Sequence, residues 1–234
     1  MVSSNAAATG ERRTVTRERL LDAAVHLADD GGVEAISMRR LGQELGVEAM
    51  SLYHHVANKE TLLDAVVERL GEDLLAEVEA DTGPAPEQDW HGALRARSLA
   101  ARRVMLRHPW LPGLLQTRSS MGPSIIRLHD QVLGVLLAGG FSYDLAHHAL
   151  HALGSRVLGF AQEVFTPGAA GEVDMPDPAA MAALAPHIMA MVAAVEHDAP
   201  EMTLGWCDDQ TEFEFSLDVV LEGLAGRLAA DHVG

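Results

Sequence analysis

The chain has 234 residues, of which 17 are Lys or Arg and 34 are Asp or Glu, giving a formal net charge of −17. This acidic excess excludes a protein that coats nucleic acid or an anionic membrane with its whole surface, although a small basic face on an acidic body is compatible with it. Hydrophobic residues make up 48% of the sequence, which excludes global disorder and allows a sizeable core in one or two domains.

The sequence predicts a cytoplasmic protein with no membrane partner. Its single cysteine, Cys207, excludes an intrachain disulfide and a zinc cluster built on cysteines, and it fits a reducing compartment. Residues 1–10 lack the apolar core of a secretory signal. The longest nearly apolar stretch, 132–141, is much too short to cross a bilayer.

Nearly every segment has the one-sided apolar periodicity of a helix, which predicts an all-α fold. In chain order, helices are expected at 16–30, 38–45, 48–56, 59–80, 88–107, 111–117, 124–138, 142–165, 178–197 and 210–230. Ser37 and Asn58 are placed to cap the second and fourth of these, and Gly46 supplies the tight turn after the second. Pro186 is expected to kink or restart the helix that contains it.

Three short helices with a glycine turn between the second and third are typical of a helix-turn-helix DNA reader. The run AISMRRLGQELGV at 35–47 leads directly into EAMSLYHHVANK at 48–59. Over roughly residues 16–63 the chain closely resembles the DNA-binding domain of the tetracycline-repressor (TetR) family, and the Leu-Tyr-x-His-Val-x-Asn-Lys ending is its most specific part. The resemblance implies a flexible arm over 1–15, a DNA-binding domain over 16–63, and a helical ligand-binding and dimerisation domain over 64–234.

Ten residues of the first domain are predicted to contact DNA. Arg39 offers a fork that matches a guanine edge, while Ala49 and Met50 offer apolar contact to thymine methyl groups. Helix amides beside Ser37 and Lys59 favour phosphate. The resemblance implies that the third helix enters the major groove, although Tyr53 taken alone is more typical of half-buried packing. The predicted contacts are Arg17, Ser37, Arg39, Ala49, Met50, Ser51, Tyr53, His54, His55 and Lys59.

The charge is spread unevenly along the chain. Residues 1–70 hold eight basic and 11 acidic groups, whereas residues 71–234 hold nine basic and 23 acidic groups. With so few basic groups, one DNA-reading domain alone would neutralise few phosphates. A two-fold dimer doubles the contacts and reads two half-sites. The sequence therefore predicts a homodimer that binds a palindromic stretch of double-stranded operator DNA in a salt-sensitive way.

The C-terminal part carries a weaker resemblance. Gln116-Thr117-Arg118 and the stretch from Gly140 to Glu163 are similar to the ligand domain of tetracycline-type repressors. This implies a small-molecule pocket among the middle helices and dimerisation through the last long ones. The candidate ligand contacts are Arg97, Trp110, Thr117, Arg118, His129, His151 and Glu163. The apolar stripe of Phe213, Leu217 and Leu221 is the candidate dimer interface, and it could equally be intramolecular core.

The effector is expected to be an organic molecule other than a tetracycline–magnesium complex. Tetracycline binders of this kind use two His and a Glu around the metal. In this sequence Leu114 and Ser155 stand where the two His are expected, and only Glu163 matches. No cofactor and no bound metal are therefore predicted.

Two alternatives remain open. His147 and His151 are spaced i, i+4 on one helical face, which suits a transition metal and would make the protein a metal-responsive regulator. A solvated polar face is the plainer interpretation of these histidines. An enzyme with an accessory DNA-binding domain is more remote, because neither a nucleophile elbow nor a phosphate-binding loop occurs in the sequence. The favoured prediction is a transcriptional repressor without catalytic residues.

Overall fold

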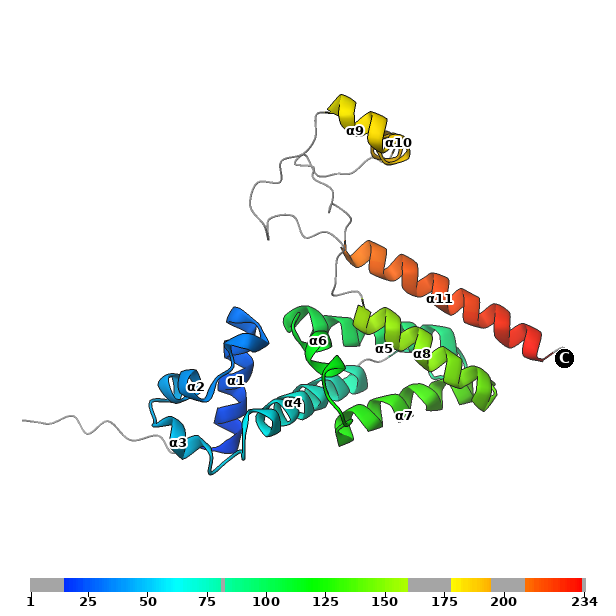
Figure 1. Cartoon of the computed structure of the whole chain (residues 1–234). Coiled ribbons are helices and arrows are strands. Elements are labelled where there is room, and N and C mark those ends of the chain that lie inside the picture. The colour runs from blue at the N-terminus through cyan, green and yellow to red at the C-terminus, as the bar shows by residue number, and fades with distance from the viewer. Residues whose placement is uncertain (1–14, 81–82, 160–177, 195–208, 233–234) are drawn as a thin grey trace, which may run out of the picture. The chain divides into compact units, whose positions relative to one another are not determined.

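The computed structural model describes residues 15–80, 83–159, 178–194 and 209–232, and all the regular elements within these ranges are helices (Figure 1). This confirms the all-α prediction for the described residues. The α-helices are α1 (Arg17–Gly31), α2 (Met38–Leu45), α3 (Ala49–Leu52), α4 (Lys59–Ala80), α5 (Trp90–Arg107), α6 (Leu111–Gln116), α7 (Pro123–Ala138), α8 (Tyr143–Gly159), α9 (Pro178–Leu184), α10 (Pro186–Ala194) and α11 (Asp209–Asp231), with a short 3-10 helix at Val33–Ala35. None of these helices is both long and apolar enough to cross a membrane.

The chain forms two compact units, Met1–Ala152 and Leu153–Gly234. In the first unit, α1 to α3 gather near the start of α4, and α5 and α7 pack along the rest of that helix (Figure 1). We call α1–α3 the head, and the helices that follow α4 in this first unit the body. The long α4 belongs to both, because it packs against α1 as well as against α5 and α7. The expected boundary at residue 63 thus falls within α4 and stays a prediction.

The head has a small apolar core of its own. Leu20 and Ala24 from α1, Ile36, Leu41 from α2 and Leu52 from α3 are all fully buried. These side chains recur at the helical spacing that the sequence shows, so their burial stabilises each helix against its neighbours.

Side-chain caps set where the helices of the head begin, as predicted. The Ser37 hydroxyl oxygen accepts a hydrogen bond from the amide of Arg40, at 3.3 Å, and so caps α2. The Asn58 side-chain oxygen accepts from the amide of Thr61, at 2.8 Å, at the start of α4. Each cap satisfies an amide that would otherwise lack a helical partner, which is worth about 1 kcal/mol.

Two predicted helices differ from the observed ones, and a third is described only in part. α3 ends at Leu52 rather than at 56, because the amide of His55 bonds to the Leu52 carbonyl three residues back, as in a turn. The helix expected over 178–197 is divided at Ala185 into α9 and α10, which confirms the predicted effect of Pro186. The helix expected over 142–165 is observed as far as Gly159, and the remainder lies outside the described residues.

Candidate nucleic-acid interface and its link to the helical body

The corner between α2 and α3 is fixed by two glycines. Gly46 has a φ of 68°, a left-handed conformation that residues with a side chain rarely adopt. Gly42 lies against the start of the next helix, and a β-carbon added there would lie 2.8 Å from the Val47 carbonyl oxygen and 3.2 Å from the Ala49 amide nitrogen. The Val47 amide also donates to the Gly42 carbonyl, at 2.9 Å. The two helices are therefore held in close backbone contact.

This corner leaves the outer face of α3 in solvent. Met50 is 74% exposed, whereas Leu52 on the same helix is fully buried. Tyr53, in the turn after α3, is 43% exposed, so its ring is not packed into the core. A short helix anchored on one side and open on the other can enter a DNA groove without unfolding the head.

The ten predicted DNA contacts lie at five places in the head: the start of α1, the start of α2, α3, the turn that follows α3, and the start of α4. Each of the ten is exposed or half-buried, so each can be reached from solvent. Lys59 is the first residue of α4, where the helix dipole also favours an anion such as phosphate.

The two predicted serine contacts differ in their hydrogen bonds. Ser37 uses its oxygen to accept from the Arg40 amide, so its hydroxyl proton can still be donated to a phosphate. Ser51 donates its proton to the Glu48 carbonyl, at 2.7 Å. To donate to a phosphate, Ser51 would have to give up this bond. Ser37 is therefore the better placed of the two.

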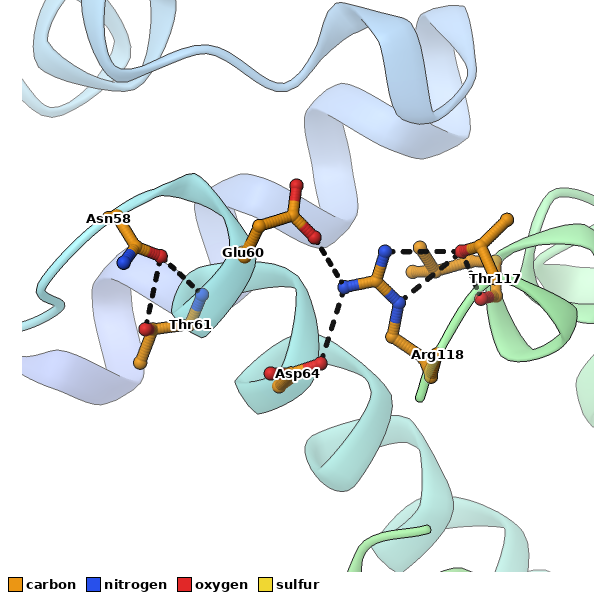
Figure 2. Close-up of polar contacts among 7 residues, drawn as sticks. Asn58, Glu60, Thr61, Asp64, Thr117 and Arg118 are labelled. Atoms are coloured by element: carbon orange, nitrogen blue, oxygen red, sulfur yellow. Dashed lines mark hydrogen bonds and ion pairs between the residues drawn. The ribbon is translucent and has the colours of Figure 1, made fainter. Parts of the chain in front are cut away.

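A polar network joins the body to the first turns of α4 (Figure 2). The Arg118 guanidinium donates from Nη1 to Glu60 Oε2 at 2.9 Å and to Asp64 Oδ1 at 3.2 Å. Its Nε and Nη2 donate to the hydroxyl of Thr117, which in turn donates to the Leu114 carbonyl at 2.7 Å. This chain of bonds runs from the end of α6 to the residues that directly follow Lys59.

A second contact ties α1 to the segment between α5 and α6. Asp29 Oδ1 lies 2.8 Å from His108 Nδ1 and accepts a hydrogen bond from Trp110 Nε1 at 2.7 Å. Beside it is a cavity of about 210 Å³ lined by Asp22, Val25, His26, Asp29, Arg69, Leu70, Asp73 and His108. Pockets for organic ligands usually measure about 300–1,000 Å³ and are mostly apolar, so this small, charged cavity is a poor candidate for one.

The candidate ligand contacts among the described residues are not gathered in that cavity, since none of these six lines it. Thr117 and Arg118 lie in the network on α4, and Trp110 bonds to Asp29. Arg97 donates from Nη1 to the Ala93 carbonyl at 3.0 Å, while its Nε is buried and has no hydrogen-bond partner among the described residues. His129 Nδ1 lies 2.7 Å from the Ile125 carbonyl on its own helix. His151 is exposed on α8, and Glu163 lies outside the described residues.

The structure corrects the candidate dimer interface. Phe213, Leu217 and Leu221 are fully buried within the single chain. The Arg156 guanidinium lies 4.7 Å from the centre of the Phe213 ring, and its Nη2 donates to the Glu212 carbonyl at 3.3 Å. These three apolar residues are therefore intramolecular core, which the sequence had left as the alternative. The other face of α11 exposes Phe215 and Val219, by 66% and 53%.

Sequence reasoning missed the acidic residues that complete both contacts with the body. Asp29, Glu60 and Asp64 lie within ordinary amphipathic helices and match no local motif. Their partners are 54 to 81 residues away along the chain. The one available signal was the predicted importance of Arg118, which implied a carboxylate or ligand partner without identifying it.

Comparison with known families settles what the chain is related to. Residues 20–66 match the family described as bacterial regulatory proteins, tetR family, and residues 83–228 match the tetracyclin repressor-like C-terminal domain. The chain belongs to the TetR family. Both matches agree with the resemblance seen in the sequence, and the second extends over more than half of the chain.

Individual TetR-family proteins resemble the chain over nearly its whole length. The HTH-type transcriptional repressor DrrR1 of Streptomyces coeruleorubidus is 31% identical over 92% of this chain and 79% of its own length. A possible TetR family regulator from Streptomyces coelicolor A3(2) has a TM-score of 0.71 and 26% identity, covering 90% of this chain and 99% of its own. The S. coelicolor TetR family protein ActR in complex with actinorhodin has a TM-score of 0.64 and 26% identity, covering 92% and 99%.

Family membership defines the broad role of this TetR-family protein. It is a DNA-binding transcriptional regulator with a helix-turn-helix head and a C-terminal TetR domain. The head described above supplies the DNA-reading surface that such a regulator needs.

Proposed function

We propose that this protein is a cytoplasmic, homodimeric repressor that binds a palindromic operator and is released from it by a small organic effector. The observation that carries the proposal is the α2–turn–α3 corner, which exposes Met50 and Tyr53 while Leu52 anchors the same helix in the core. The corner positions a reading surface, and the Arg118 network connects that surface to a much larger helical body.

The ten predicted DNA contacts of the head have different roles in binding. Arg39, exposed on α2, and Met50, exposed on α3, are assigned to base edges in the major groove. Lys59 and Ser37, each at a helix start, are assigned to phosphates, which fix the register without reading sequence. The other six predicted DNA contacts lie on the same head: Arg17, Ala49, Ser51, Tyr53, His54 and His55.

A second copy of the chain is the partner that this arrangement requires. Two heads related by a two-fold axis would read half-sites about 34–36 Å apart, or a multiple of that spacing. Phe215 and Val219 lie one turn apart on the exposed face of α11 and form an apolar patch that water disfavours. We assign this patch to the dimer interface, in place of Phe213, Leu217 and Leu221.

The effector is proposed to act through the connection between the body and α4. If ligand binding moves the end of α6, the Thr117–Arg118 network transmits that movement to Glu60 and Asp64 in the first two turns of α4. The effect is limited to the difference between the effector's affinities for the operator-binding state and for the released state. An organic effector is supported by the ActR complex with actinorhodin. In this chain Leu114, at one of the metal-ligand positions of tetracycline binders, is buried and has no metal-binding atom in its side chain.

The proposal is tested by titrating the full-length protein with DNA from upstream of its own coding sequence. Arg39→Ala should reduce discrimination between the operator and mutated operators, because a base contact is lost. Lys59→Ala should weaken binding to all DNA sequences alike. It should also reduce the slope of log K against log salt by about 0.9 per lost phosphate contact. Arg227→Ala, at an exposed position on α11, is the matched control and should bind as the unmodified protein does. Binding that is equally tight on unrelated DNA would contradict the proposal.

A further inference from the structure

One histidine cluster lies outside the DNA-reading head and outside its contacts with the body. His147, His148 and His151 are exposed residues of α8 in the first compact unit. The rings of His147 and His151 have centroids 4.7 Å apart and planes inclined at 80°. The rings of His147 and His148 are 5.7 Å apart, as expected for side chains that leave the helix in different directions.

We propose that His147 and His151 together bind a divalent transition-metal ion on the surface of α8. Residues four apart lie one above the other on a helix, so the two imidazoles can present nitrogen atoms to one ion. Both side chains are exposed, so water can fill the remaining coordination positions. The described part of the chain holds no group of three or more His, Cys, Asp or Glu side chains that could hold a metal, so the proposed site has two protein ligands.

The observed ring spacing fits a shared ion. A metal about 2.0–2.1 Å from an imidazole nitrogen lies about 3.2 Å from the centre of that ring. Two imidazoles on one metal then have centroids about 4.5 Å apart at a right angle and about 5.2 Å apart at a tetrahedral angle. The 4.7 Å separation of His147 and His151, in an edge-to-face contact, lies between these values, so the two rings are already at a distance that a shared ion requires.

The helix holds the pair in place before any metal arrives. Ala146 and Ala149, on the opposite side of α8, are fully buried, so this part of the helix is anchored in the core. The two histidines therefore lose only side-chain rotation on binding, which reduces the entropic cost. Imidazole ligands suit zinc, copper, iron and nickel ions, and affinity along the divalent series is highest for Cu²⁺.

The site is tested with untagged full-length protein, titrated with Ni²⁺ by calorimetry and with Cu²⁺ by electron paramagnetic resonance. We expect saturable binding and a copper spectrum with coupling to two imidazole nitrogens. His147→Gln and His151→Gln should each weaken binding by at least about tenfold, because loss of even an outer-shell partner costs about 10–100-fold. Each should also reduce the coupling to one nitrogen.

His148→Gln is the matched control, since it removes an exposed histidine from the same turn and leaves the pair intact. It should bind both ions as the unmodified protein does, and the variant that lacks both His147 and His151 should show only background binding. Copper coupled to fewer than two imidazole nitrogens in the unmodified protein would overturn the proposal without any variant. So would an equal loss of affinity in His148→Gln. Operator binding without metal is measured separately, so failure of this site leaves the proposed repressor function untouched.

Discussion

Arg118 Nη1 lies 2.9 Å from Glu60 Oε2, which joins the segment between α6 and α7 to the first turn of the helix that leaves the DNA-reading head. The Arg118 side chain is only 12% exposed, whereas the Glu60 side chain is 70% exposed. The arginine is thus largely covered by the body, while its acceptor on α4 is open to solvent. This difference makes the contact suited to connect a change in the body with the orientation of the head.

Replacing Arg118 by Gln should loosen this connection. Both bonds to α4 are lost, and because Glu60 and Asp64 are largely exposed we expect a loss of only about 1 kcal/mol in the free energy of unfolding. Operator affinity should fall severalfold, since binding must then order the heads. Urea denaturation and fluorescence anisotropy measure the two effects. The same substitution at the exposed Arg227, which lies outside the network, should leave both unchanged. Equal operator affinity in Arg118→Gln would remove this network from the proposed mechanism.

Gly42→Ala should damage the corner that positions α3. The new β-carbon would lie 2.8 Å from the Val47 carbonyl oxygen, so the backbone must shift, at a cost of about 1–3 kcal/mol in the free energy of unfolding. Operator affinity should fall with it. Gly134→Ala is the control, because that glycine lies within α7 and an added β-carbon meets no atom within 4 Å. It should stabilise the protein by about 0.5–1 kcal/mol, and chemical denaturation distinguishes the two outcomes.

Local chemistry in the sequence was sufficient to predict the helices and caps of the head. Ser37 and Asn58 carry short side chains with oxygen acceptors directly before apolar periodic segments, and both cap as expected. The end of α3 was not predictable in this way. The residues after Leu52 retain helix-like spacing in the sequence, but the amides of His54 and His55 bond to carbonyls three residues back, a distinction that periodicity does not carry.

Contacts between segments far apart in the chain could not be predicted from the sequence. The partners of Arg118 lie 54 and 58 residues away on an unremarkable helix face. Likewise, α11 has apolar residues on two faces, and only the packing of the whole chain determines that Phe213 is buried while Phe215 is exposed. The periodicity identified a helix correctly but could not identify which face remains open.

Glu77→Gln should lower stability in a pH-dependent manner. Hydrogen bonds from Arg103 and then Arg107 hold the pKa of the Glu77 carboxyl below its ordinary value of 4.5. The charged form thus stabilises the folded state above that value, and the contribution is lost as the pH falls through the lowered pKa. Urea midpoints of Glu77→Gln should lie below those of the unmodified protein at pH 7 and approach them in acid. Added salt should reduce the difference in urea midpoint between Glu77→Gln and the unmodified protein. Glu222→Gln on α11 is the control and should show no such difference.

Phe215→Arg should shift the protein from dimer to monomer. Phe215 is 66% exposed in the single chain, so an arginine there costs the fold little, whereas in a two-fold interface it would place charge in an apolar contact. Light scattering after size exclusion measures the mass. Ile126→Arg, at a 53% exposed position on α7, is the matched control and should remain dimeric. Operator affinity should fall in Phe215→Arg alone, because a monomer reads one half-site and neutralises half as many phosphates. A variant that stays dimeric at micromolar concentration would remove this face of α11 from the interface.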